Sequence, residues 1–290
     1  MNPIWYLPHH AVWHPRKPDE PRIVFDCAAK TEGVSLNDQL LKGPENTCSL
    51  IGVILRFRVD NVAVAADVRR MYYQVFVAPE DRGALCYLWW PDGDITKEPK
   101  THQMLVHIFG ATSSPSVAEY ALRRTAKDNQ SEYSPEAVDA VQRDFYVDDL
   151  LKSFPNSERA IEVCKQQQSI LARGGFTLTK WMSNNRDVLS AFPDNEHAPA
   201  VKNLDLKSEK LPIDRALGIH WDVEGDTFRM KTGRREHPES RKGVLSSIPT
   251  EYDPLGFASP LMLIGREINQ ELCKLKYDWD EALPENLLIR

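Results

Sequence analysis

Three aspartates stand where they could bind a divalent cation. Asp148 and Asp149 are adjacent within the largely apolar run at 145–151, and Asp67 ends an apolar stretch at 61–67. Carboxylates in such company are costly to bury unless their charge is compensated, and side by side they raise one another's pKa. Two Mg²⁺ ions roughly 3.5–4 Å apart suit hard oxygen ligands and remove the conflict. The pattern predicts a metal site at a strand turn, with Mn²⁺ as an alternative ion.

An Asp-Asp pair taken alone is more often a solvated surface turn. The apolar frame around Asp148 and Asp149, together with a strand-terminal acid upstream, favours the metal site instead. A metal-dependent hydrolase that reuses adjacent acids is a further alternative. It is the least favoured of the functions considered for this chain, because it leaves the glycine, tyrosine and proline motifs described below unexplained.

Two predicted strands must position the acids. Residues 61–67 read as a buried strand, and residues 144–151 read as strand, turn, strand. Successive residues of a strand face opposite sides, so a tight turn is needed if Asp148 and Asp149 are to approach one site. If the strand that ends at Asp67 lies beside this hairpin, the three acids converge.

The remaining elements mix strands and helices without a regular alternation. Helices are predicted from Ser114, from Ser134 to about residue 141, and over 157–173 with Ser157 as its cap. The other expected elements are strands at 22–26, 104–109 and 176–178, a strand pair at 74–77 and 84–90, a helical turn at 35–41, a hairpin of 215–221 with 227–230, a linker at 187–203, and helices over 241–271 broken at 253–256. This order favours an α+β architecture, with an antiparallel sheet and helices on one face.

Bulk composition excludes several classes of protein. The chain has 290 residues, a net charge of −6 and a hydrophobic fraction of 42%. It has no apolar run near the roughly 18 residues of a membrane helix and no signal peptide at its N-terminus. The five cysteines are scattered without metal-ligand spacing, which predicts free thiols and no zinc site. We expect a cytoplasmic or nuclear protein that is not secreted and has no membrane partner. The local basic excess at 229–242 is as consistent with a solvated loop as with a nucleic-acid contact.

The chain resembles the reverse transcriptase of BEL/Pao long-terminal-repeat retrotransposons over nearly its whole length. Tyr146-Val147-Asp148-Asp149 matches the catalytic signature of that family. The other matching motifs follow in the family's order: Arg22-Ile23-Val24-Phe25-Asp26 with Ser35-Leu36-Asn37-Asp38, Ala66-Asp67-Val68-Arg69-Arg70-Met71-Tyr72-Tyr73-Gln74, Phe109-Gly110-Ala111-Thr112-Ser113-Ser114-Pro115, Gly174-Gly175-Phe176-Thr177-Leu178-Thr179-Lys180-Trp181, and Leu217-Gly218-Ile219-His220-Trp221. Tyr252-Asp253-Pro254-Leu255-Gly256 and Trp279-Asp280 resemble segments of the Pao retrotransposon peptidase family.

The resemblance implies a right-hand polymerase with truncated fingers, a palm built on an antiparallel sheet and a helical thumb. Residues 1–232 would form the fingers (about 1–50 and 78–108), the palm (about 51–77 and 109–210) and a primer-grip hairpin (about 211–232). Residues 233–290 would form a thumb- or connection-like segment. The upstream fingers strands are expected to be missing, and no aspartic-protease, RNase H or integrase signature is recognised.

The resemblance also implies a role for each site residue. Asp67, Asp148 and Asp149 would hold two Mg²⁺ ions, with the Val68 carbonyl as a further ligand, and Lys180 would donate a proton to the leaving pyrophosphate. The dNTP would contact Arg22, Tyr72, Phe109 and Gly110, and the primer and template would contact Tyr146, Leu217, Gly218 and Trp221. A second basic residue of the fingers would be Arg16 or Lys17. For Arg22, Tyr72, Gly110, Lys180 and the hairpin residues, an ordinary structural role is the alternative.

The implied function is that of an RNA-directed DNA polymerase domain of a retrotransposon polyprotein. It would join a dNTP to the 3′-hydroxyl of a primer on an RNA or DNA template by two-metal nucleotidyl transfer. The alternative is a truncated, catalytically inactive retroelement remnant that only binds nucleic acid. Cytoplasmic virus-like particles or the nucleus would be its location, and the sequence leaves the oligomeric state open.

Overall fold

The computed structural model describes residues 4–14, 17–230, 237–247 and 253–283. The chain forms two compact units, Met1–Ala198 and Pro199–Arg290. All five cysteines are free, as expected. No helix among the described residues is long and apolar enough to cross a membrane.

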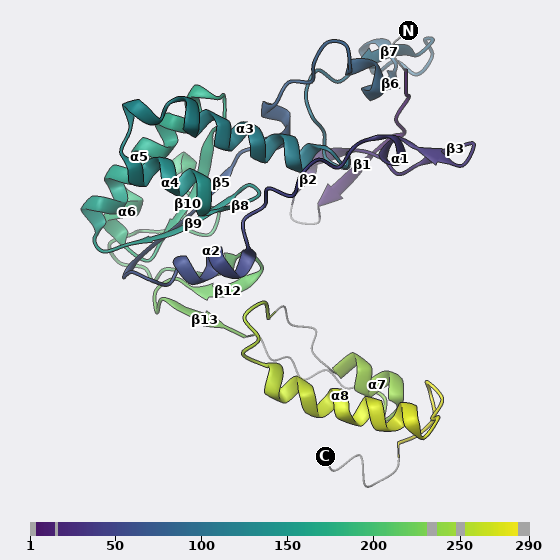
Figure 1. Cartoon of the computed structure of the whole chain (residues 1–290), viewed down its shortest axis with the longest axis vertical. Coiled ribbons are helices and arrows are strands. Elements are labelled where there is room, and N and C mark those ends of the chain that lie inside the picture. The colour runs from purple at the N-terminus through teal and green to yellow at the C-terminus, as the bar shows by residue number, and fades with distance from the viewer. Residues whose placement is uncertain (1–3, 15–16, 231–236, 248–252, 284–290) are drawn as a thin grey trace. The chain divides into compact units, whose positions relative to one another are not determined.

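A four-stranded antiparallel sheet is the largest sheet among the described residues of the first unit (Figure 1). Its strand order is β10 (Leu178–Ser183), β5 (Val62–Val68), β9 (Asp149–Phe154) and β8 (Phe145–Tyr146). The predicted strand at 61–67 and the predicted hairpin at 144–151 are therefore confirmed as neighbours. The small and β-branched residues of β5 suit this central position, because both faces of the strand are largely buried.

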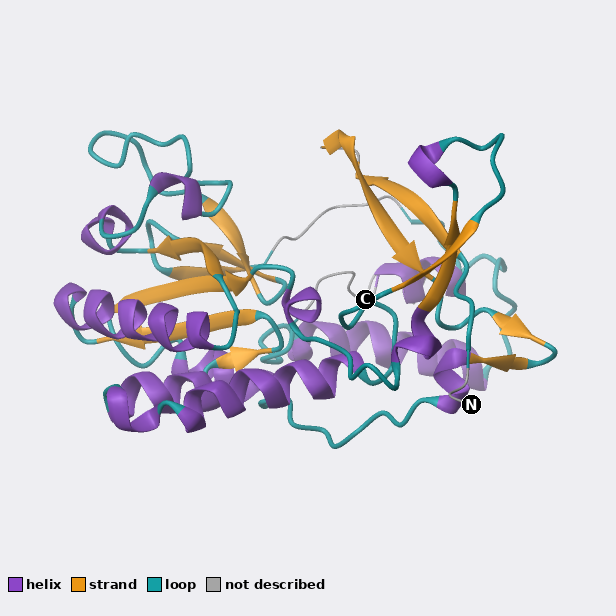
Figure 2. Ribbon diagram, turned by 90° about the horizontal axis from the view of Figure 1, so that it is seen from above, coloured by secondary structure: helices purple, strands orange, loops and turns teal. Residues whose placement is uncertain are grey.

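Three helices cover one face of this sheet: α3 (Ser114–Asp128), α4 (Pro135–Arg143) and α5 (Ser157–Arg173). Figure 2 shows these helices and the strands in separate layers. The helices share a core with alternate residues of β5, namely Val62, Val64, Ala66 and Val68. Asp67 therefore lies on the opposite face of the sheet, because successive strand residues alternate in direction.

The helix starts follow the sequence signals with one correction. Ser134 caps α4 by accepting a hydrogen bond from the Ala137 amide, and proline occupies the first turns of both α3 and α4. The cap of α5 is Asn156 and not Ser157, since the Asn156 side chain accepts the Arg159 amide at 2.9 Å. Both residue types are favoured caps, so the sequence alone did not separate two adjacent candidates.

The N-terminal part of the first unit is built from short strand pairs. β1 (His9–His14) pairs with β2 (Lys17–Phe25), and β3 (Lys30–Thr31) pairs with β4 (Val34–Ser35). Two short helices follow, α1 (Leu36–Gln39) and α2 (Leu50–Arg56). A capping box begins α1, in which Ser35 and Asp38 bond each other's backbone amides. A separate core buries the residues Leu7, Phe25, Cys27, Leu36, Val77, Leu85, Ile108 and Ala111.

The expected strand pairing between 74–77 and 84–90 is wrong. β6 (Cys86–Trp89) pairs with β7 (Lys100–Gln103), and Phe76 forms an isolated bridge with Val106. The predicted strand at 104–109 is likewise wrong beyond that bridge. Three 3₁₀ segments lie in this region, Met71–Gln74, Arg82–Leu85 and Pro91–Gly93. Another, Gln130–Glu132, lies between α3 and α4. Short apolar runs do not identify their partners, so non-local pairing decided these strands.

Two further expectations in the first unit need correction. The strand predicted at 176–178 begins only at Leu178 and continues to Ser183 as β10. The region predicted as a linker at 187–203 contains α6 (Arg186–Ser190) and a 3₁₀ turn, Asp194–Glu196. Asn185 caps α6, and asparagine is a favoured capping residue. The helix itself is too short to show a clear periodic pattern in the sequence.

The described residues of the second unit form a three-stranded antiparallel sheet and two helices. The strands are β11 (Ile213–Ala216), β12 (Ile219–Asp222) and β13 (Thr227–Arg229), so the single strand expected at 215–221 is in fact interrupted by a turn. The helices are α7 (Arg241–Ser247) and α8 (Ser259–Lys274), which confirms the predicted break near 253–256. Ile268 and Leu272 of α8 form a small core with Val244 and Tyr277.

Candidate active site

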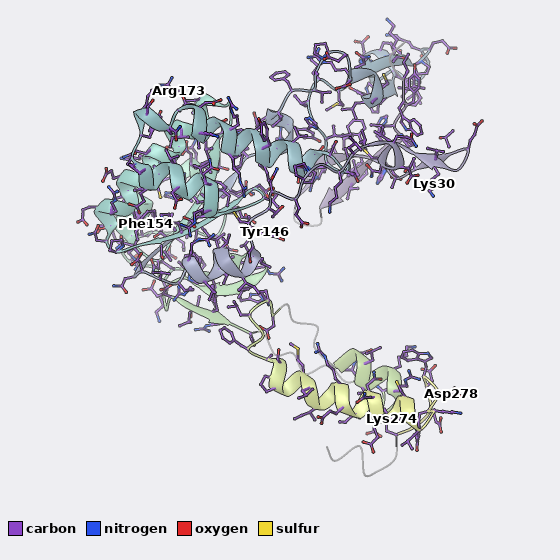
Figure 3. The ribbon with its side chains drawn as sticks, in the orientation of Figure 1. Lys30, Tyr146, Phe154, Arg173, Lys274 and Asp278 are labelled. Carbon is purple, nitrogen blue, oxygen red and sulfur yellow. The ribbon has the colours of Figure 1, made fainter. Side chains whose placement is uncertain are left out.

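Asp67 and Asp149 are direct partners across the antiparallel β5–β9 pair. Opposed residues of such a pair point to the same face, which here is the face away from the helix layer. Asp148 lies beside them in the turn between β8 and β9, next to Tyr146, which pairs with Asp149 and is labelled in Figure 3. The three predicted acids are therefore close neighbours in the structure.

The turn that carries Asp148 has an unusual backbone. Val147 adopts a left-handed conformation, with φ of 56°, which a β-branched residue rarely does. The Val68 amide donates to the Asp148 carbonyl at 2.8 Å and ties this turn to the end of β5. Backbone strain at this position is therefore balanced by a link between two of the predicted metal-binding segments.

Burial and mutual repulsion perturb the acids. Burial first, and then the charges of Asp148 and Asp67, raise the pKa of Asp149 to about 7. Burial and the neighbouring Asp67 likewise raise the pKa of Asp148. Carboxyl groups with perturbed pKa values are common at functional sites, where a ligand or a metal ion can compensate their charge.

Lys180 supplies a positive charge at this site. Its Nζ lies 2.8 Å from Oδ2 of Asp67. The strand β10 bulges here, because Thr179 pairs with Asp67 while Met182 pairs with Ala65. Lys180 itself is left-handed, with φ of 58°. The sequence predicted Lys180 near the acids, and the structure places it in an ion pair with one of them.

The three acids have the ligand chemistry that a divalent cation needs, but their side chains are not arranged around one metal position. Carboxylate oxygens are the ligands that Mg²⁺ prefers, and two of the three groups have raised pKa values that a cation would lower again. Within the described part of the chain, however, no three His, Cys, Asp or Glu side chains already surround a common metal position. Asp67 is instead turned towards Lys180.

An aromatic and arginine cluster lies near the acids. The Phe109 ring is 4.5 Å from that of Tyr72 and 5.7 Å from that of Tyr73, between centroids. The guanidinium carbon of Arg22 is 4.8 Å from the same Phe109 centroid, a cation–π distance. Burial and then the charge of Asp148 raise the pKa of Tyr72, which places this cluster within electrostatic reach of the acids.

Gly110 lies in a tight loop that Asn37 clamps. Gly110 has φ of 100°, and a Cβ there would lie 3.0 Å from the Phe25 carbonyl oxygen, so a side chain would be strained by both its backbone conformation and its close contact. The Asn37 amide donates to the Gly110 carbonyl at 2.9 Å, and its Oδ1 accepts the Thr112 amide at 2.9 Å. Asn37 belongs to one of the motifs identified in the sequence, but no role was predicted for it.

A second supporting group was also missed. The Asp144 carboxylate is nearly inaccessible, and it binds Arg56 Nε at 2.7 Å and Lys152 Nζ at 3.3 Å. Asp144 immediately precedes β8, and its carbonyl accepts the Leu151 amide of β9 at 3.0 Å. These contacts of Asp144 therefore anchor the hairpin that carries Asp148 and Asp149. The unusual acid next to Phe145 was the signal available in the sequence.

The hairpin residues of the second unit behave differently from one another. Leu217 and Gly218 form the two-residue turn between β11 and β12, with φ of 48° and 85°. Trp221 is 1% exposed, and its indole donates to Asp226. Trp221 is therefore a buried packing residue, and the expectation that it touches a primer is not supported. Arg16 lies outside the described residues, as does the side chain of Lys17.

The family comparison concerns the end of the chain. Residues 240–290 match the family described as Pao retrotransposon-like RNaseH-like domain. The expected resemblance to Pao elements is thereby confirmed, although the matched family is described as RNaseH-like and not as a peptidase. The described part of this segment, 240–247 and 253–283, contains α7 and α8 and no extended strand. No curated protein matches the chain significantly.

Solved structures of foamy viral protease–reverse transcriptase resemble the fold. One, a complex with double-stranded DNA, has a TM-score of 0.55 and 14% identity, covering 100% of this chain and 43% of the viral chain. Another complex with double-stranded DNA has a TM-score of 0.54 at 14% identity, covering 100% and 51%. The selenomethionine-labelled mutant of the prototype foamy virus protein gives 0.50 at 16%, covering 99% and 32%. The chain thus spans about half or less of these relatives and shares their mixed α and β fold.

Proposed function

We propose, from the premise that this chain is a BEL/Pao-type retroelement protein, that it is the RNA-directed DNA polymerase part of a retrotransposon polyprotein. The observation that carries this proposal is the meeting of Asp67, Asp148 and Asp149 on the sheet face opposite the helix layer, with Tyr72 within their electrostatic reach. Residues 1 to about 210 would provide the fingers and palm. The β11–β13 sheet would provide the primer grip, and α7 and α8 would provide a thumb- or connection-like segment.

In the proposed reaction the primer 3′-oxygen attacks the α-phosphorus of a dNTP. A bond forms between these atoms, and the bond from the α-phosphorus to the bridging oxygen of the β-phosphate breaks. The 3′-hydroxyl proton passes to solvent, and Lys180 donates a proton to the departing pyrophosphate. Two Mg²⁺ ions held by Asp67, Asp148, Asp149 and the Val68 carbonyl would lower the pKa of the attacking hydroxyl and neutralise the triphosphate.

The cluster around Phe109 would bind the incoming nucleotide. Arg22 is exposed and presents a planar guanidinium that can bind the triphosphate in a bidentate manner. Tyr72 would exclude a ribose 2′-hydroxyl by its bulk, which selects deoxynucleotides. Gly110 would let the backbone approach the new base pair, and Asn37 would hold that loop in place. The contacts at the Phe109 ring and in the Gly110 loop support these proposed roles.

Template and primer are the proposed partners. Tyr146 is half-buried at the start of the acid-bearing turn, where a primer terminus would lie. Leu217 and Gly218 form a tight turn whose backbone could contact the primer strand. Two solved structures of foamy viral protease–reverse transcriptase with a similar fold contain double-stranded DNA, which supports a nucleic-acid partner here.

Primer extension on poly(rA)/oligo(dT) with dTTP and Mg²⁺ tests the proposal. The chain should extend the primer, and Asp148→Asn should abolish extension while template binding persists. Template binding without any extension by the unaltered chain would instead favour an inactive remnant. Cleavage of a phosphoester in the absence of dNTPs would favour a metal-dependent hydrolase.

A further inference from the structure

Lys180 reaches Asp67 through two departures from regular strand geometry. Three residue steps separate Thr179 from Met182, whereas two separate their partners Asp67 and Ala65, so β10 carries an extra residue at this point. Lys180 also has a left-handed backbone, with φ of 58°. Bulges near functional sites re-aim side chains, and a left-handed non-glycine residue persists only where its surroundings hold it. Both departures direct the Lys180 ammonium towards the acids.

The Lys180–Asp67 ion pair is exposed enough to open and re-form. Lys180 is 54% exposed and Asp67 is 18% exposed at the side chain, and the two are joined at 2.8 Å. Partly exposed ion pairs contribute little to stability and open readily. A lysine ammonium is also a compact charge on a flexible stem, so it can leave without moving β10.

Asp67 Oδ2 accepts the Lys180 ammonium, so that oxygen is not free for a metal ion in the same geometry. A metal ion on this carboxylate would also be repelled by the nearby ammonium, because the acids are half-buried. This accounts for the lack of a closed three-ligand set among the described residues. It also explains how three neighbouring acids persist in the metal-free chain.

We propose that Lys180 is an internal cation that holds Asp67 in the metal-free protein and competes with the divalent ion for it. This inference rests on the proposed function, because it concerns the same three acids. When the metal ion takes Asp67, the Lys180 ammonium is released. It then becomes free to meet a leaving group, so metal loading and the availability of the proton donor are one event.

Mn²⁺ binding to the full chain tests the competition without any activity assay. The loss of the free Mn²⁺ signal in electron paramagnetic resonance measures this binding. Lys180→Met should bind Mn²⁺ about two- to fivefold more tightly, the range that a partly exposed ion pair supports. The control is Lys165→Met, which removes the same charge from an exposed position on α5 and should leave the affinity unchanged. Lys180→Arg keeps the charge and should not tighten binding.

The outcomes separate the inference from the proposed function. Equal or weaker Mn²⁺ binding by Lys180→Met would overturn the competition while leaving the metal site intact. Absence of Mn²⁺ binding by the unaltered chain would overturn the metal site and the inference together. Should Lys180→Met fail to fold, Lys180→Gln is measured against Lys180→Arg with the same two criteria.

Discussion

Asp67 and Asp149 face each other directly across β5 and β9, on the side of the sheet that the three helices leave uncovered. This register is what turns two distant sequence positions into one site. A shift by one residue would send one of the two carboxylates into the helix-side core. The strained turn at Val147 then brings Asp148 beside the pair.

The raised pKa of Asp149 predicts a pH dependence of stability in the metal-free protein. Between the ordinary carboxyl value of 3.8 and about 7, the unfolded chain has lost this proton while the folded chain keeps it. Stability should therefore fall as pH rises through this window. Urea denaturation in EDTA from pH 5 to 8 should show this fall, and Asp149→Asn should reduce it. An identical pH dependence in both proteins would contradict the raised value.

Gly110→Ala should destabilise the fold by about 1–3 kcal/mol, because it adds a Cβ at positive φ and sets it 3.0 Å from the Phe25 carbonyl oxygen. Gly33 is the matched control: its φ is 85° and a Cβ there has nothing within 4 Å. Gly33→Ala should therefore cost less. Urea denaturation measures both, and equal losses would show that the close approach to Phe25 is unimportant.

Arg56→Met should destabilise the protein by about 3 kcal/mol, since it leaves the buried Asp144 carboxylate with a weaker set of partners. Arg124→Met removes an exposed pair with Asp128 and should cost under about 0.5 kcal/mol. The free energies of unfolding provide the comparison. Equal effects would mean that Asp144 does not depend on Arg56 to hold the hairpin.

If the chain polymerises dNTPs as proposed, Tyr72→Ala should let it incorporate ribonucleotides, lowering its preference for dTTP over UTP by about tenfold or more, as a steric pocket change allows. The ratio of kcat/KM values for the two nucleotides measures this. Tyr120→Ala, at a 59% exposed position on α3, serves as the control and should leave the ratio unchanged. An unchanged ratio in Tyr72→Ala would assign that ring to packing against Phe109 alone.

The sequence predicted the elements whose signals are local. The apolar strand before Asp67, the Ser134 cap of α4 and the break before α8 were all readable. Features decided by distant partners were not, such as the pairing of β6 with β7 and the burial of Trp221. The Asn37 clamp binds Gly110 and Thr112, which lie 73 and 75 positions further along the chain. No local sequence pattern encodes such a contact.

The Lys180–Asp67 ion pair illustrates the same limit within the site. Residue types and motif order placed a lysine near the acids. Its bulge and left-handed backbone depend on how β10 is registered against β5. That register results from packing of the whole sheet and cannot be inferred from β10 alone.

Asp67, Asp148 and Asp149 are proposed to support nucleotidyl transfer to a primer. Single-turnover incorporation of one dTMP opposite an RNA template, in Mg²⁺, tests it most directly. We predict incorporation by the unaltered chain and by Asp187→Asn, a change at an exposed acid on α6, and loss of incorporation in Asp149→Asn with template binding retained. Incorporation by Asp149→Asn at the unaltered rate, or none by the unaltered chain, would contradict the account.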